Sequence, residues 1–154
     1  MATAMSGNEV FEMAMGMERI GKDFYEALAL GCDNSQVRAF CVTTARQEAG
    51  HLEAFRKMRD QWVKSVPSRP VPPEGADGLA SLAKGRIQPD PAAVHKVAIG
   101  GNLKDALNMA IQMEQDAVSF YQELAARLPD SAKAIQLIVE EEKRHLSGLR
   151  SLAV

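Results

Sequence analysis

The chain contains little cysteine. Cys32 and Cys41 are the two cysteines among 154 residues, and they do not form a CxxC pair. Iron and zinc sites built on such pairs are therefore excluded, as is a disulfide framework. A chain of this length buries enough surface to hold a core without disulfides. We interpret both residues as free thiols in a protein of one domain, residues 1–154.

Basic stripes and long apolar runs are also missing. Lysine and arginine number 18 against 20 aspartates and glutamates, and the basic residues are scattered. This distribution disfavours nucleic acid and anionic membrane surfaces as partners. No stretch reaches the roughly 18 apolar residues of a membrane-spanning helix. The first 17 residues lack the basic and apolar segments of an export signal, so we expect a cytoplasmic protein.

Proline is nearly absent outside one segment, since six of the seven prolines lie between residues 66 and 92. We interpret residues 65–101 as a long connection that contains a short helix at 78–84, because structureless loops of this length are uncommon. The flanking segments have helical periodicity, and each is broken once by turn residues. Helices are predicted over these ranges: 8–30, 35–64, 103–128 and 132–152. The chain is thus expected to be all-α, a four-helix bundle of two helical hairpins joined by a long crossover.

An internal repeat relates the two hairpins. Residues 17–28 match residues 113–124 at Met, Glu, Phe, Tyr and Leu. In the same order, Glu48, His51 and Leu52 match Glu142, His145 and Leu146. Each hairpin is therefore one copy of a single unit, and a bundle with pseudo-twofold symmetry follows.

The repeated polar residues lie within apolar stripes. Glu48 and His51 continue a series of apolar positions in steps of three and four, and Glu142 with His145 does the same in the last helix. Glu18 and Glu114 occupy the inward columns of the first and third helices. Each long helix is therefore predicted to point one carboxylate into the bundle.

Four buried carboxylates repel one another, and burying each one unpaired costs several kcal/mol. Two divalent cations would neutralise them, and two neutral imidazoles would complete the donor set. A histidine three residues after a glutamate lies on the same helix face, so each such pair offers an oxygen and a nitrogen to one metal. These donors favour iron or manganese. The predicted ligands are Glu18, Glu48, His51, Glu114, Glu142 and His145.

Three other polar features are interpreted less directly. Tyr25 and Tyr121 lie two turns beyond Glu18 and Glu114, where each hydroxyl can hydrogen-bond a glutamate of the opposite hairpin or belong to an ordinary aromatic core. His95 lacks a glutamate partner and is expected at the surface or in packing. Within residues 140–142, only the last glutamate is in register with the apolar stripe, so the other two are expected to be solvated.

This set of residues resembles the ferritin-like di-iron carboxylate proteins, and within them the rubrerythrin group. The resemblance covers nearly the whole chain except the proline-rich connection. It implies a cofactor of two iron ions, with manganese or zinc as substitutes. By the same resemblance, Glu48 and Glu142 would bridge the ions, Glu18 and Glu114 would be terminal ligands, and each histidine would hold one ion.

The chain departs from that group in two respects. Typical rubrerythrins add a rubredoxin domain with two CxxC pairs that relays electrons, and this chain has none. An external electron donor such as rubredoxin is therefore expected. Peroxidase rubrerythrins also carry an extra glutamate one turn after the third-helix ligand, where this chain has Ala117. Ala117 has no carboxylate, so this chain lacks the residue to which the redox-linked ligand exchange is attributed.

Three functions remain as hypotheses. The leading one is an oxidoreductase in which a di-iron centre reacts with peroxide or dioxygen while Tyr25 and Tyr121 hold the ligand shell. In an iron-handling protein, the same site would oxidise Fe²⁺ for storage or delivery. In a structural bundle, the metal would only hold the carboxylates together. A homodimer is also expected, because Phe40 and Trp62 lie outside the main apolar stripe and because rubrerythrin-like bundles usually pair.

Overall fold

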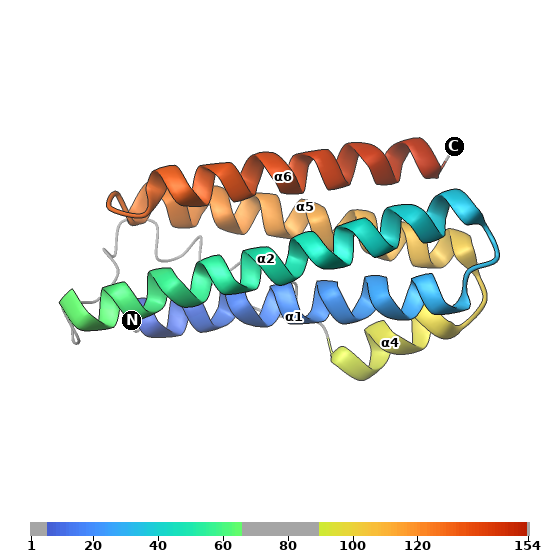
Figure 1. The fold of residues 1–154 in the computed structure, drawn as a ribbon, viewed down its shortest axis with the longest axis horizontal. Coiled ribbons are helices and arrows are strands. Elements are labelled where there is room, and N and C mark those ends of the chain that lie inside the picture. The colour runs from blue at the N-terminus through green and yellow to red at the C-terminus, as the bar shows by residue number, and fades with distance from the viewer. Residues whose placement is uncertain (1–5, 66–89, 154) are drawn as a thin grey trace, which may run out of the picture.

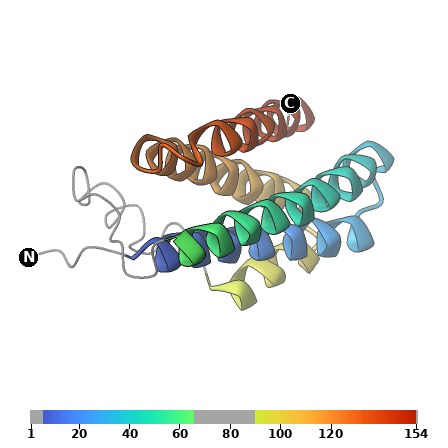
Figure 2. The ribbon, with the colours of Figure 1, turned by 60° about the vertical axis from the view of Figure 1, so that its left-hand side comes forward.

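The computed structural model describes residues 6–65 and 90–153, and every element in these ranges is an α-helix (Figure 1). The elements are α1 (Gly7–Gly31), α2 (Ser35–Ser65), α4 (Pro91–Ile99), α5 (Leu103–Arg127) and α6 (Ala132–Leu152). The hairpin of α5 and α6 is stacked on the hairpin of α1 and α2, and α4 lies on the outer side of α1 (Figure 2). The all-α bundle of two hairpins is confirmed, and its long helices agree with the predicted ranges to within one residue.

Polar side chains fix the beginnings of three long helices. The Ser6 hydroxyl accepts from the Glu9 backbone N–H, and the Glu9 carboxylate accepts from the Ser6 N–H at 2.7 Å, which forms a capping box. Asn34 accepts from two N–H groups at the start of α2. Asn102 accepts from the Asp105 N–H at 3.1 Å and so caps α5.

A helix that was not predicted lies at the end of the connection. The helix expected at 78–84 falls outside the described residues, whereas Pro91–Ile99 forms α4. Asp90 caps it by accepting from the Ala92 N–H at 3.1 Å, and proline at the first position has the backbone angle that a helix needs. Both signals are visible in the sequence. His95 is exposed on α4, in agreement with the expectation of a surface residue.

The buried apolar side chains form two clusters, one towards each end of the bundle. One includes Phe11, Phe55 and Phe120. The other includes Phe24 and Leu149, together with Cys41. Along each long helix, the buried glutamate falls between residues of the first cluster and residues of the second. The polar centre is thus enclosed at both ends by closely packed apolar layers.

Phe40 and Trp62 pack against the chain's own core, and the second contact surface expected for them stays a prediction. The Phe40 ring lies 6.3 Å from the Tyr25 ring, and the Trp62 ring lies 6.4 Å from that of Phe11. Both are partly buried against the core clusters. Trp62 occupies the space beside Gly7, where an added Cβ would lie 2.1 Å from the indole nitrogen.

Among the described residues, no helix combines the length and apolarity needed to cross a membrane.

The packing around Cys41 leads to a prediction about thiol reactivity. Cys41 is fully buried, and burial together with the neighbouring Cys32 raises its pKa to about 12. Because the thiolate is the reactive form, Cys41 should not react with a thiol reagent at pH 8 while the bundle is folded. A Cys32→Ser variant, which retains only this thiol, should react after denaturation in guanidinium. Rapid reaction of the folded variant would show that this part of α2 does not pack as described.

Candidate metal centre

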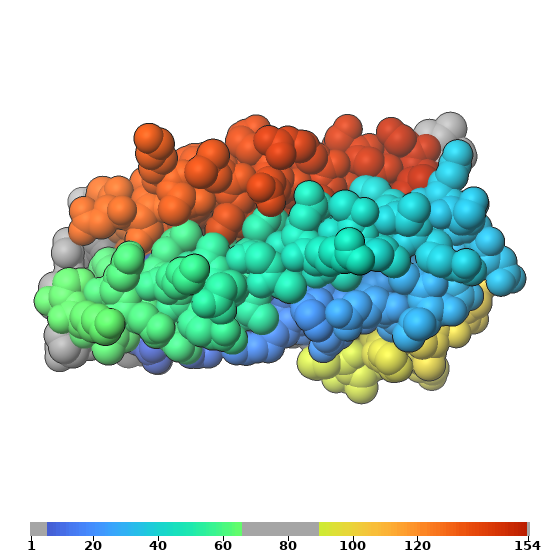
Figure 3. Space-filling view, in the orientation of Figure 1, coloured from blue at the N-terminus to red at the C-terminus, as the bar shows by residue number. Residues whose placement is uncertain are grey.

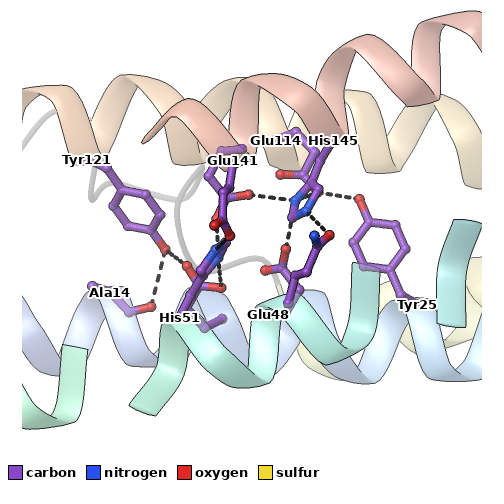
Figure 4. Close-up of polar contacts among 11 residues, drawn as sticks. Ala14, Tyr25, Glu48, His51, Glu114, Tyr121, Glu141 and His145 are labelled. Carbon is purple, nitrogen blue, oxygen red and sulfur yellow. Dashed lines mark hydrogen bonds and ion pairs between the residues drawn. The ribbon is translucent and has the colours of Figure 1, made fainter. Parts of the chain in front are cut away.

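The four long helices each bring one carboxylate to the middle of the bundle: Glu18 from α1, Glu48 from α2, Glu114 from α5 and Glu142 from α6. His51 and His145 follow one turn after the glutamates of α2 and α6 and point to the same place (Figure 4). None of the six side chains belongs to a residue more than 5% exposed. The structure thus brings together all six ligands predicted from the sequence.

The six residues form two overlapping donor groups. Glu18 and His51 complete one group, and Glu114 and His145 complete the other, while Glu48 and Glu142 belong to both. Within each group, four donor atoms lie within 4.8 Å of one another. Two neighbouring positions for a cation, with two carboxylates shared between them, follow from this arrangement.

The inward nitrogen of each imidazole faces the carboxylates. Nδ1 of His51 lies 2.9 Å from a Glu142 oxygen and 3.5 Å from a Glu18 oxygen. Nδ1 of His145 lies 3.1 Å from an oxygen of Glu48 and 3.1 Å from the other oxygen of Glu142. Each Nδ1 is therefore placed to donate its lone pair to the same position as the carboxylate oxygens.

The outward nitrogens have partners that the sequence analysis missed. Nε2 of His51 lies 2.6 Å from a Glu141 oxygen, and Nε2 of His145 lies 2.8 Å from the Gln47 side-chain oxygen. Glu141 was expected to be solvated, and although its side chain is 39% exposed, it reaches a buried imidazole. The internal repeat could have indicated these partners, because Gln47 and Glu141 occupy matching positions, each directly before a buried glutamate.

Both tyrosines hold a carboxylate of the opposite hairpin. The Tyr25 hydroxyl donates to Oε1 of Glu114, and the Tyr121 hydroxyl donates to Oε1 of Glu18 at 2.5 Å. Both rings are almost completely buried, so no water competes for these bonds. The tyrosines were expected either to hydrogen-bond a glutamate of the opposite hairpin or to be ordinary aromatic core residues. The structure shows the hydrogen bonds. Each bond orients a carboxylate, and in Glu18 the second oxygen lies 3.5 Å from Nδ1 of His51.

Burial and close packing shift the pKa values of the ionisable groups in the site. Burial and the surrounding carboxylates raise the pKa values of three glutamates well above the ordinary value: Glu18, Glu48 and Glu114. Burial opposes ionisation of Glu142 too, but the adjacent imidazoles of both histidines outweigh it and lower that pKa. Burial lowers the histidine pKa values, yet the adjacent carboxylates outweigh it and raise them to about 9 for His51 and about 12 for His145. The centre therefore favours positive charge.

Several buried donor atoms have no hydrogen-bond partner, which tests whether the residues fit a metal. Among the described residues these atoms are Oε2 of Glu18, Oε1 of Glu48, Nδ1 of His51 and Oε1 of Glu142. All four belong to one of the two donor groups. An unsatisfied buried polar group costs about 1–3 kcal/mol. A cation at this position would satisfy all four atoms at once, so the residues fit a metal site.

The close contact between Gly21 and Glu48 leads to a prediction about metal affinity. A Cβ at residue 21 would lie 3.0 Å from Oε2 of Glu48, so Gly21→Ala should displace this shared carboxylate and weaken metal binding about tenfold or more. The matched control is Gly50→Ala, because an added Cβ there meets no atom within 4 Å. The control should bind metal normally and raise the free energy of unfolding by about 1 kcal/mol. Equal affinities for the two variants, measured by titration, would contradict this account.

Comparisons with known proteins agree with this geometry. Residues 105–153 match the family model of rubrerythrin. The fold matches that of a Thermotoga maritima protein described as ferritin-like and diiron-carboxylate, with a TM-score of 0.73, 24% identity, and coverage of 99% of this chain and 97% of that chain. No curated protein matches the chain. The chain therefore has the ferritin-like fold, its C-terminal hairpin matches rubrerythrin, and the resemblance inferred from its sequence is confirmed.

Proposed function

We propose that this chain is a di-iron protein, with Glu48 and Glu142 shared between the two ions. The observation that carries the proposal is the pair of overlapping, buried donor groups. Each group supplies three carboxylates and one imidazole, a mixture of oxygen and nitrogen donors that suits iron, with manganese or zinc as substitutes. Tyr25 and Tyr121 would orient the carboxylates of Glu114 and Glu18 through their hydroxyl groups.

We further propose that the protein is an oxidoreductase acting on peroxide or dioxygen. Two bound ferrous ions supply two electrons, the number needed to reduce peroxide to water. A pocket of about 180 Å³ lies between α2 and α6 and is lined by Gln47, Glu141 and His145 among others. It opens at the surface and reaches the imidazole of His145. A pocket this small suits a small molecule such as peroxide better than an organic substrate.

The chain's own residues would support this reaction in three ways. The apolar clusters at both ends of the centre exclude water. The tyrosine hydroxyls keep the carboxylates oriented. On the face drawn in Figure 3, α2 and α6 meet closely, and a small pocket lies between them. Oxidation of Fe²⁺ for storage or delivery uses the same site and is the alternative function.

Three further points remain predictions from the sequence. They are an external electron donor such as rubredoxin, a homodimer and a cytoplasmic location. The homodimer is supported by the family resemblance and by Phe40 and Trp62, which are only partly buried against the chain's own core. The donor follows from the absence of CxxC pairs in this chain.

The donor groups predict two irons per chain and a bundle stabilised by them. Metal at 100 times its Kd stabilises a fold by about 2.7 kcal/mol, which corresponds to roughly 5–10 °C in Tm for a chain of this size. Chelation should lower Tm accordingly, and the double variant Glu18→Gln with Glu48→Gln should abolish iron binding while raising Tm of the metal-free protein, because burial raises the pKa of both carboxyls. The control is Glu53→Gln with Glu140→Gln, because both residues form exposed ion pairs that contribute little.

Elemental analysis and thermal unfolding would measure these effects. Saturation at one iron per chain or none would contradict the two-ion site. An unchanged Tm of the metal-free double variant would show that these glutamates face solvent.

The proposed reaction predicts peroxide consumption that depends on a separate donor. The iron-loaded protein with rubredoxin, rubredoxin reductase and NADH should consume peroxide, and NADH oxidation measured by absorbance should stop when rubredoxin is omitted. The control is the same mixture with the metal-free double variant, which should be inactive. If the iron-loaded protein oxidises no NADH in the complete mixture, peroxide reduction through this donor is wrong, whereas the iron stoichiometry would still test the site itself.

A further inference from the structure

The two metal positions differ in the group that accepts the outward N–H of each histidine. His51 bonds to a carboxylate, Glu141, whereas His145 bonds to an amide, Gln47. We infer that Gln47 and Glu141 are positioning residues that make the two positions unequal, so that the one beside His51 holds its cation more tightly than the one beside His145. This inference rests on the proposed two-metal site.

These two hydrogen bonds first determine which ring nitrogen of each histidine carries the proton. When Nε2 carries the proton and donates it to a side-chain oxygen, Nδ1 carries the lone pair. In both histidines, Nδ1 is the atom that faces the buried carboxylates, at 2.9 Å from Glu142 for His51 and 3.1 Å for His145. Gln47 and Glu141 therefore hold both rings in the form that binds a cation through Nδ1.

The two bonds are otherwise matched. Each acceptor directly precedes a shared glutamate on its own helix, and each reaches across to the histidine of the other hairpin. The distances are similar, 2.6 Å for Glu141 and 2.8 Å for Gln47. Both residues also line the same pocket between α2 and α6. What remains different is the charge of the acceptor.

A charged acceptor strengthens the histidine as a ligand. A carboxylate that accepts the outer N–H pushes electron density towards Nδ1, and such partners are worth about 10- to 100-fold in metal affinity. Glu141 also adds a negative charge on one side of the centre, and an amide adds none. Both effects favour the cation beside His51, and neither is available to the cation beside His145.

The test is a titration of the metal-free protein with Co²⁺, whose visible spectrum reports each binding step, in competition with a chromophoric chelator at fixed pH. Wild type should bind in two distinguishable steps. Glu141→Gln should weaken the tighter step about 10- to 100-fold, and Gln47→Glu should strengthen the weaker step by a similar factor. Both residues are at the rim of the site, so neither substitution disturbs the core. A purely structural role cannot explain a gain in affinity from Gln47→Glu.

The matched control is Glu140→Gln, which removes the same charge from the neighbouring exposed residue, where it pairs with Lys143. This variant should leave both steps unchanged. A second experiment assigns the steps: Glu141→Gln should weaken Co²⁺ binding in a His145→Gln background but have no further effect in a His51→Gln background. The rim variants in the wild-type background remain decisive if a histidine variant fails to fold.

The outcomes separate the inference from the proposed function. Two equal steps in wild type, or equal losses in the variants of residues 140 and 141, would overturn the inequality while leaving the two-metal site intact. No change from Gln47→Glu would also overturn it. A wild-type protein that binds no Co²⁺ at all would instead overturn the proposed function.

Discussion

The structure depends on the cost of placing four carboxylates in the core of a helical bundle. Water would ordinarily solvate these groups, yet each belongs to a residue at most 4% exposed. Without a cation, the pKa values of three glutamates and of both histidines are raised, which favours neutral carboxyls and charged imidazoles and lowers this cost. Within residues 6–65 and 90–153, four buried donor atoms still lack a hydrogen-bond partner. The centre is thus stable enough to fold and remains suited to a cation, as a binding site requires.

The rest of the bundle holds this centre rigidly. Apolar clusters pack on both sides of it along the helices, so the glutamates cannot turn towards solvent without opening the core. The tyrosines add directional bonds from inside the bundle, and Gln47 and Glu141 add them from the rim. Because these bonds cross between hairpins, the geometry of the site and the docking of the hairpins depend on each other.

Much of this could be predicted from local patterns. Helical periodicity gave the long helices, and the inward positions of Glu18 and Glu114 followed from the same spacing. The helix α4 was missed although Asp90 and Pro91 provide a cap and a first turn. Glu141 was missed because its position in the helix repeat indicates the surface, and it is in fact partly exposed. Periodicity describes the direction of a Cβ, but a long side chain can still turn back to a buried partner.

The sequence by itself determined the helices, the repeat and the inward direction of six ligands, since each depends on spacing within one helix. Tertiary structure decided which groups meet. Tyr25 bonds a glutamate 89 residues away, and Gln47 bonds a histidine 98 residues away. It also placed Phe40 and Trp62 against the chain's own core. These contacts depend on the rotation and offset of one hairpin on the other, which side-chain packing sets and which no periodicity within a single helix encodes.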